Sequence, residues 1–163
     1  MRKFFLFAFA FTLVLGSISF APVQASAESD KVMVDGFEYP KTHLEALEYF
    51  NEIRRNVGVQ ELKLDPYLTK AAENHARYLY RNKISFTAGL EAHSEEPDKE
   101  GFTGESPWDR AYAVGLDKSH AVSEVISFGS YSIIRGIDFL IKTPFHRMDM
   151  LNYSHEKVGF AIV

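Results

Sequence analysis

The sequence between residues 65 and 82 reads DPYLTKAAENHARYLYRN, and this stretch predicts a helix with well-marked ends. Asp65 and Pro66 are typical of a helix start, because proline is tolerated at the first helical position, where its missing N–H is not needed. Small and apolar side chains then recur every three or four residues and form one face. They are Leu68, Ala71, Ala72, His75, Ala76 and Leu79. We expect this face to be buried and the helix to end at Asn82.

A second helix with one apolar face is predicted just before this stretch, between Thr42 and Gly58. Thr42 and Glu45 have the spacing of a capping box, and Gly58 interrupts the pattern. The apolar positions are again three or four residues apart, at Leu44, Leu47, Phe50, Ile53 and Val57. Residues 28–41, ahead of this helix, form a short lead segment.

The segment from Ser85 to Glu105 has no periodicity and is rich in acidic residues around His93. Its carboxylates are Glu91, Glu95, Glu96, Asp98, Glu100 and Glu105. We interpret the segment as a long acidic loop. Irregular loops of this length are often functional in compact domains, whereas a charge run is by default a solvated surface, and both interpretations stay open.

Two more helices are predicted downstream of the acidic loop. Ser106 and Pro107 open a short helix that Gly115 ends. Residues 130–142 form a longer one, which ends at Thr143-Pro144 because the residue before a proline disfavours helical backbone.

The last part of the chain supplies the strand that decides the fold class. Residues 124–128, EVISF, form a short apolar run that fits either a strand or a buried turn. Residues 157–163, KVGFAIV, are apolar on both alternating faces, as expected of a strand in a sheet covered by helices on both sides. Helices first and a strand late favour an α+β fold or a three-layer α-β-α sandwich over a repeating βαβ fold.

The first 27 residues have the layout of an export signal. Arg2 and Lys3 precede an apolar run from Phe4 to Leu15, and small residues end at Ala27, after which we expect cleavage. The run has 12 residues, fewer than the roughly 20 that cross a bilayer as a helix, so a retained anchor is the weaker interpretation. We therefore expect a protein that is secreted, extracellular or associated with the cell wall.

Composition limits the classes of function. The 163 residues contain no cysteine and carry a formal charge of -4. An acidic chain argues against general nucleic-acid binding, which needs a basic face to neutralise phosphates. The absence of cysteine suits an exporter that does not rely on oxidative folding, such as a Gram-positive bacterium. Residues 42–163 have the length of one domain.

The familiar catalytic motifs are absent from the sequence. It has no G-x-S-x-G elbow and no P-loop, and His155-Glu156 lacks the second histidine of H-E-x-x-H. Enzymatic chemistry would therefore rest on histidines and carboxylates. Of the six histidines, His75 fits a hydrogen-bonded core position better than a ligand, while His43, His120 and His155 fit the surface.

His93 and His146 differ from the other histidines because each lies where regular structure breaks, a common place for function. If they converge with Glu124, two imidazoles and one carboxylate make a three-ligand set that leaves one zinc position for water. Spacing alone favours a structural polar cluster over a metal site, because such long-range triplets arise by chance.

Many short motifs along the chain resemble those of one known family. They are Asn51-Glu52-Ile53-Arg54, Gly58, Leu62, Leu64-Asp65, Leu68, Ala72, His75-Ala76, His93-Ser94, Glu124, Pro144-Phe145-His146-Arg147, Leu151-Asn152 and Val158-Gly159. In this order they resemble the bacterial branch of the CAP superfamily, which groups cysteine-rich secretory, antigen 5 and pathogenesis-related proteins and whose domain is also called SCP. The segment around Gly101-Phe102-Thr103-Gly104 resembles secreted members from bacilli.

The resemblance implies an α-β-α sandwich with a cleft lined by two histidines and two glutamates, which holds a divalent metal in some members. By motif, the histidines are His93 and His146 and the first glutamate is Glu124, although Ser123 and Val125 replace the usual glycine and asparagine around it. The second glutamate has no counterpart, since Asp138 is the carboxylate nearest its place and the role is not transferred to it. A divalent metal such as zinc is therefore the cofactor to expect.

The resemblance favours a secreted CAP/SCP-domain binding module over an enzyme. Relatives have been linked to lipids or sterols, peptides and cell-wall components, and fold alone does not choose among them. Two alternatives stay open: a metal-dependent, peptidase-like hydrolase with Glu124 as base or ligand, and a structural envelope or spore-associated protein.

The family usually continues beyond Val158-Gly159 with another strand that completes the sheet. We therefore expect residues 42–163 to form a domain shortened at its carboxyl end, with an open edge on the terminal strand. Such an edge invites pairing with a second copy, unless the lead segment around Lys31–Val34 covers it.

Overall fold

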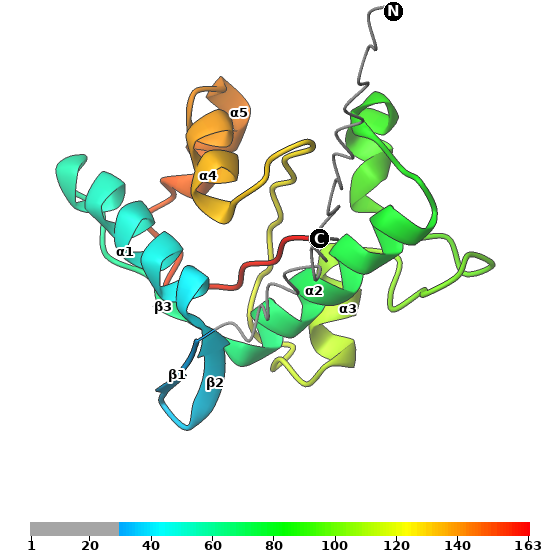
Figure 1. The fold of residues 1–163 in the computed structure, drawn as a ribbon, viewed down its shortest axis with the longest axis horizontal. Helices are drawn as coiled ribbons and strands as arrows, with labels where there is room; N and C mark the ends of the chain where they lie inside the picture. Colours follow the sequence, from blue (N-terminus) through cyan, green and yellow to red (C-terminus); the bar gives the residue numbers. More distant parts are fainter. Residues whose placement is uncertain (1–29) are drawn as a thin grey trace, which may run out of the picture.

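The computed structural model describes residues 30–163 and has an α+β fold (Figure 1). The helices are α1 (Lys41–Asn56), α2 (Pro66–Arg81), α3 (Pro107–Ala113), α4 (Ile133–Ile141) and α5 (Pro144–Met150), with a 3₁₀ segment η1 (Phe86–His93). The strands are β1 (Lys31–Val34), β2 (Phe37–Pro40), β3 (Lys63–Leu64) and β4 (Lys157–Val158). The predicted export signal lies outside the described residues. Among the residues that are described, none of the helices has the length and apolar character to span a membrane.

The helices form two groups with extended chain between them (Figure 1). In one group α4 packs against α1 and α5, and in the other α3 packs against α2. Figure 1 shows the yellow segment before α4 and the red terminal segment running through the space between the groups. This arrangement leaves the centre of the molecule to irregular chain.

The main hydrophobic core lies in the α1 and α4 group. Its buried side chains are Ala46, Phe50, Leu62, Ile137, Leu140, Met150 and Phe160. A smaller cluster joins Ala71 of α2 to Ala111 of α3, so the apolar face predicted for residues 65–82 is divided between packing on α3 and the centre of the molecule.

Local signals predicted most helix ends correctly. The Asp65 side chain accepts hydrogen bonds from the N–H groups of Tyr67 and Leu68 and caps α2, and Asn82 follows its last turn. Ser106 and Asp109 form a complete capping box at α3. The capping box predicted at Thr42 is wrong, because α1 begins one residue earlier, after Pro40, without a side-chain cap.

The region of α4 and α5 differs from the prediction. The helix predicted over residues 130–142 is the shorter α4, capped by the Ser132 hydroxyl. Pro144 does not only end that helix, because it also occupies the first turn of α5, where its missing N–H is harmless. His146 therefore lies on a helix rather than in irregular chain.

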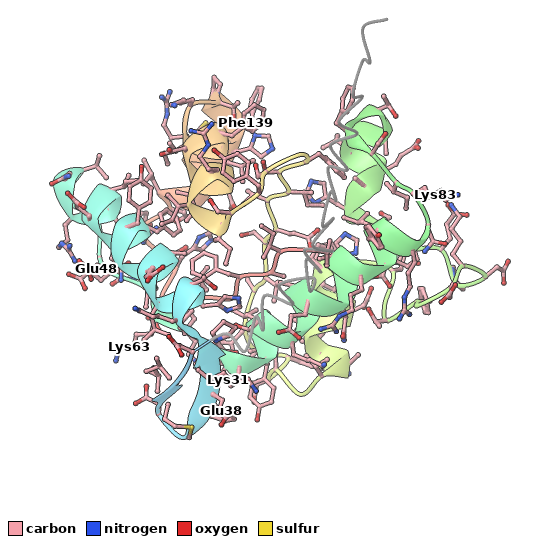
Figure 2. The ribbon with its side chains drawn as sticks, in the orientation of Figure 1. Lys31, Glu38, Glu48, Lys63, Lys83 and Phe139 are labelled. Atoms are coloured by element: carbon pink, nitrogen blue, oxygen red, sulfur yellow. The ribbon has the colours of Figure 1, made fainter. Side chains whose placement is uncertain are left out.

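The strands pair in two small sheets. β1 and β2 form an antiparallel hairpin, whose turn residues Asp35 and Gly36 both have positive φ. The lead segment therefore pairs with itself and does not cover the terminal strand. Lys31 and Glu38 face each other across this hairpin, with 3.1 Å between Nζ and Oε2, at the edge of the molecule (Figure 2).

The second sheet is a short parallel pair of β3 and β4. Asn51 of α1 holds β3 in place, since its amide donates to the Leu62 carbonyl at 2.9 Å and accepts from the Leu62 N–H at 2.8 Å. The strand predicted over residues 157–163 is assigned as strand only at Lys157 and Val158, and the rest runs on without a turn or bend.

Arg54 fixes the chain that leads into β4. Its buried guanidinium donates to the carbonyls of Gln60, Met150 and Asn152, at 2.7, 2.6 and 3.1 Å. Burial lowers the pKa of this guanidinium, and these carbonyl partners carry no formal charge. The motif residues Asn51 and Arg54 are therefore structural, and together they hold β3 and the approach to β4 against α1.

Candidate functional site

Five polar side chains meet between α2, α3 and the acidic segment. They are His75, His93, Glu95, Arg110 and Glu124, which we call the polar network. His75, Glu95 and Arg110 are each at most 2% exposed, so their polar atoms depend on one another for partners.

Arg110 is the centre of the polar network. Its Nη2 lies 3.0 Å from Oε1 and 2.8 Å from Oε2 of Glu124, so one nitrogen donates to both carboxylate oxygens. Its Nη1 donates to the carbonyls of His93 and Glu105 at 3.1 and 3.2 Å. Arg110 thus joins α3 to the segment of Glu124 and to the end of η1.

His93 and Glu124, both predicted as site residues, contact each other directly. The His93 Nδ1 lies 2.9 Å from Oε1 of Glu124. His93 is less buried than the rest of the network, with 26% of its side chain exposed, and is its most solvent-accessible member.

His75 and Glu95 form the buried end of the network. The His75 Nδ1 lies 2.9 Å from Oε1 of Glu95, and its Nε2 lies 2.9 Å from the Ala92 carbonyl. Carboxylate and carbonyl oxygens are both acceptors, so the doubly protonated imidazole is the form that donates to both. The second Glu95 oxygen accepts the Thr103 N–H at 2.6 Å, and the Tyr78 ring stacks on His75.

Both carboxylates of the network have lowered pKa values. Burial by itself would raise the pKa of Glu124, but the hydrogen bond from His93 and the charges of His75 and Arg110 hold it below its ordinary value. Burial likewise acts to raise the pKa of Glu95, and the hydrogen bonds from His75 and Thr103 outweigh it. Neither carboxylate is poised to take up a proton near neutral pH, as a general base would need to be.

His146 lies apart from this network in its contacts. Its Nδ1 lies 2.7 Å from the Thr143 hydroxyl at the start of α5. Within residues 30–163, no hydrogen bond or ion pair links His146 to His93 or to Glu124. The structure therefore joins two of the three predicted site residues and leaves the third separate.

The donor set does not fit a zinc ion in this arrangement. Both oxygens of Glu124 already face the Arg110 guanidinium, whose positive charge opposes a cation there. Nowhere in the described part of the chain are three or more histidine, aspartate or glutamate side chains grouped to hold a metal ion. Metal binding by His93, Glu124 and His146 stays a prediction.

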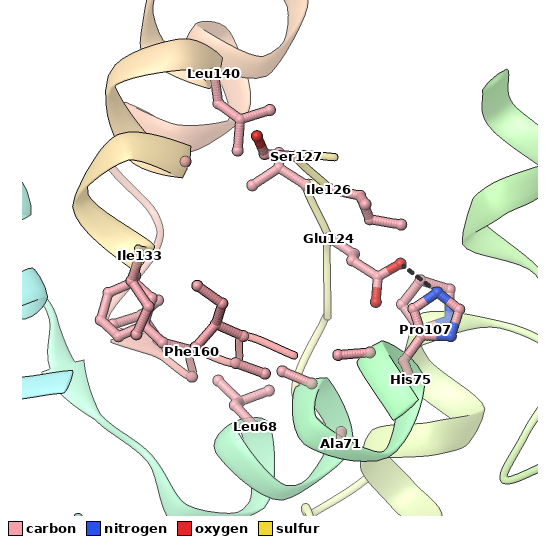
Figure 3. A pocket seen from close by; sticks show the side chains of 18 of the residues that line it. Leu68, Ala71, His75, Pro107, Glu124, Ile126, Ser127, Ile133, Leu140 and Phe160 are labelled. Carbon is pink, nitrogen blue, oxygen red and sulfur yellow. Dashed lines mark ion pairs between the residues drawn. The ribbon is translucent and has the colours of Figure 1, made fainter. Parts of the chain in front are cut away.

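A cavity of about 490 Å³ opens beside the polar network, between the two helix groups. Figure 3 shows Glu124 and His75 facing each other on one wall, with Ile133 and Leu140 on the opposite side. The Glu124 Oε1 and the His75 Nε2 are 3.7 Å apart. The volume is typical of small-ligand pockets, and most of the lining is apolar.

Two chain segments line the cavity without a break. Every residue from Val122 to Ser130 and every residue from Lys157 to Val163 contributes to its wall. Small side chains of α2, Ala72 and Ala76, leave the space open on a third side. The cavity thus lies where both extended segments pass between the helix groups.

Sequence reasoning missed three members of the network. His75 was expected in the core and is indeed buried and hydrogen-bonded, but its neighbours Glu95 and Arg110 were not singled out. Glu95 was masked by the surrounding acidic run, and only its distant partners distinguish it from that run. His43 was expected at the surface and is buried instead, against Phe160.

Asp138, near the place of the second family glutamate, lies outside the network. Its side chain accepts a hydrogen bond from the Tyr49 hydroxyl and so ties α4 to α1. This contact gives Asp138 a structural role.

Comparisons with known proteins place the fold. The model of the family described as CAP, the cysteine-rich secretory protein family, matches residues 47–163. Among solved structures, an outer surface protein from Borrelia burgdorferi is similar, with a TM-score of 0.56 and 20% sequence identity over 80% of this chain and 84% of that chain. No curated protein matches the chain.

Proposed function

The chain belongs to the CAP family of cysteine-rich secretory proteins, and from this premise we propose that it is an extracellular binding module whose ligand occupies the central cavity. The export-signal layout of residues 1–27 supports the location, as does the family's secretory character. The similar Borrelia protein is named as an outer surface protein, which agrees with a place outside the cell.

The observation that carries the proposal is the cavity of about 490 Å³ with an apolar lining and one polar wall. On that wall the Glu124 carboxylate is already neutralised by Arg110 and His93. A ligand that enters this space buries apolar surface without having to displace a metal ion or compensate a free charge.

The same contacts argue for binding rather than hydrolysis. A metal-dependent hydrolase would need Glu124 to act as a base or a ligand, whereas Arg110 occupies both of its oxygens. The structural envelope or spore-associated protein stays an alternative, and it predicts that filling the cavity has no effect on any ligand.

The proposal is tested with Nile red, a neutral dye whose fluorescence rises in apolar sites. Ala72 and Ala76 lie one turn apart on α2 and line the cavity, so the double change Ala72→Leu and Ala76→Leu fills part of it. We expect the dye to bind about tenfold more weakly to this variant, a loss of about 1.4 kcal/mol.

The matched control is Arg77→Leu, which adds a leucine to an exposed position of the same helix. It is expected to leave dye binding unchanged. Equal binding by the cavity variant and the control would show that the dye does not use the cavity and would contradict the proposed site.

A further inference from the structure

The backbone of both cavity segments lacks hydrogen-bond partners in the described structure. From Ala121 to Tyr131, no N–H or carbonyl pairs with another described residue. The same holds from Gly159 to Val163, beyond the last bond of β4. Backbone groups of half-buried chain are normally paired, so two such rows beside one cavity need an explanation.

The direction of the free groups in the terminal segment follows from β4. The carbonyls of Glu156 and Val158 accept from the N–H groups of Lys63 and Asp65 of the β3 region, at 3.0 and 2.9 Å. Because successive residues of extended chain point to opposite sides, the backbone groups of Ala161 point away from β3. The cavity is lined on this open side by the segment 122–130.

We propose that the cavity is an acceptor slot for one extended peptide strand donated by another protein, which pairs with residues 122–127 on one side and 159–163 on the other. This inference rests on the proposed function and names the class of ligand. A strand has free donors and acceptors along both edges, so it satisfies both rows at once and extends the β3–β4 sheet. A lipid chain fills the same volume but leaves these backbone groups unpaired.

Charge and side chains refine the occupant. Residues 30–163 contain 16 lysine and arginine residues against 21 aspartate and glutamate residues, so a basic peptide is attracted to this chain. Alternate side chains of the strand would face the apolar lining near Phe160 and Ile137. A peptide with β-branched residues between lysines matches these features.

The probe is the eight-residue peptide KVTVTVTK, added to the full chain. Hydrogen exchange measured by mass spectrometry should show about tenfold slower exchange in both segments, 122–127 and 159–163, when the peptide is bound. Two further peptides carry N-methyl groups on alternate residues, one on the odd and one on the even positions.

The methylated peptides separate two modes of binding. Each has lost the donors of one edge, and a strand held between two edges needs both, so neither should bind. If one methylated peptide protects the chain as well as the parent does, the strand adds to a single edge and the slot is wrong. If neither segment is protected by the parent peptide, the proposal is wrong as a whole.

Two proline variants test the geometry within the terminal segment. Ala161→Pro removes an N–H that faces the slot, whereas Ile162→Pro removes its neighbour on the opposite side. We expect about tenfold weaker peptide binding for Ala161→Pro only. Equal losses in both variants would contradict the predicted direction of these groups.

The outcome is distinguishable from failure of the binding function itself. Nile red binding that persists in Ala161→Pro while the peptide fails to bind the unaltered chain keeps the cavity as a ligand site and overturns the peptide. Protection of both segments that appears without peptide and rises with protein concentration, together with a dimer in light scattering, assigns the slot to a second copy and also overturns the proposal.

Discussion

Arg110 binds Glu124 through one guanidinium nitrogen, which lies 3.0 and 2.8 Å from the two carboxylate oxygens. The Arg110 side chain is 1% exposed and that of Glu124 is 18% exposed, so the pair lies largely outside water. The same guanidinium lies 3.9 Å from Glu95 through its Nε. One fixed positive charge therefore serves two carboxylates at the wall of the cavity.

Removing this charge is expected to destabilise the protein strongly. Arg110→Met keeps an unbranched chain but leaves Glu95 and Glu124 buried without their guanidinium, and such changes cost about 3–5 kcal/mol. Urea denaturation followed by circular dichroism measures the free energy of unfolding. Arg77→Met is the control, because it breaks an exposed pair with Glu73 and should cost less than about 0.5 kcal/mol. Similar costs for both variants would show that the buried pair is not structural.

Acid sensitivity follows from the lowered pKa of Glu124. Because the folded-state pKa lies below the unfolded one, the unfolded chain binds more protons in acid, and the stability contributed above about pH 4.3 is lost as the pH falls through the folded value. Glu124→Gln removes this component, so its unfolding free energy should change less between about pH 5 and pH 3. Glu45→Gln, at an exposed position of α1, should keep the steep dependence of the parent.

His43 predicts a separate loss of stability at a higher pH. Its ring is 4% exposed, its Nδ1 has no hydrogen-bond partner among the described residues, and burial lowers its pKa. The folded state then holds the neutral ring while the unfolded chain takes up a proton, so stability falls as the pH drops through about 6.5. His43→Leu should flatten the unfolding midpoint between about pH 7.5 and pH 5.5. His120→Leu, which alters an exposed histidine, should leave that slope in place.

Zinc offers a direct test of the predicted metal ligands. Because Arg110 faces both oxygens of Glu124, calorimetry should detect no zinc binding that depends on His146. The comparison is between the unaltered chain and His146→Ala, both without a histidine tag. Binding that is present in the first and lost in the second would mean that α5 moves His146 to the network and that Arg110 gives way.

The sequence predicted those features that depend on neighbours along the chain. The caps at Asp65 and Ser106 are local hydrogen-bonding patterns, and both appear as expected. The partners of Glu95 are His75, Thr103 and Arg110, which are 8 to 20 residues away, so no local pattern marks it among the other acidic residues. Family motifs brought His93 and Glu124 together correctly, because they encode long-range contacts that periodicity does not.

The short length of β4 has a similar cause. Alternation predicted a strand over residues 157–163 from its side chains, but a strand is assigned only where a neighbour pairs with it. In the described structure that neighbour is β3, which is two residues long and is fixed by Asn51. The remaining residues keep the extended form without a partner, a result that side-chain pattern alone does not contain.

Gly159 and Gly136 supply the last prediction, in opposite directions. A Cβ on Gly159 would lie 2.1 Å from the Thr69 nitrogen and 2.2 Å from the Leu68 carbonyl carbon, both backbone atoms that cannot turn away. Gly159→Ala must therefore push the terminal segment off the start of α2, and we expect it to lower the urea midpoint and to speed hydrogen exchange in residues 157–163. Gly136 lies inside α4, where a Cβ would meet Ser127 at an ordinary 3.6 Å. Gly136→Ala should raise stability by about 0.5–1 kcal/mol, because alanine loses less conformational freedom in a helix. If Gly159→Ala is as stable as the parent chain, the close contact between the terminal segment and α2 does not exist in solution, and that wall of the cavity lies elsewhere.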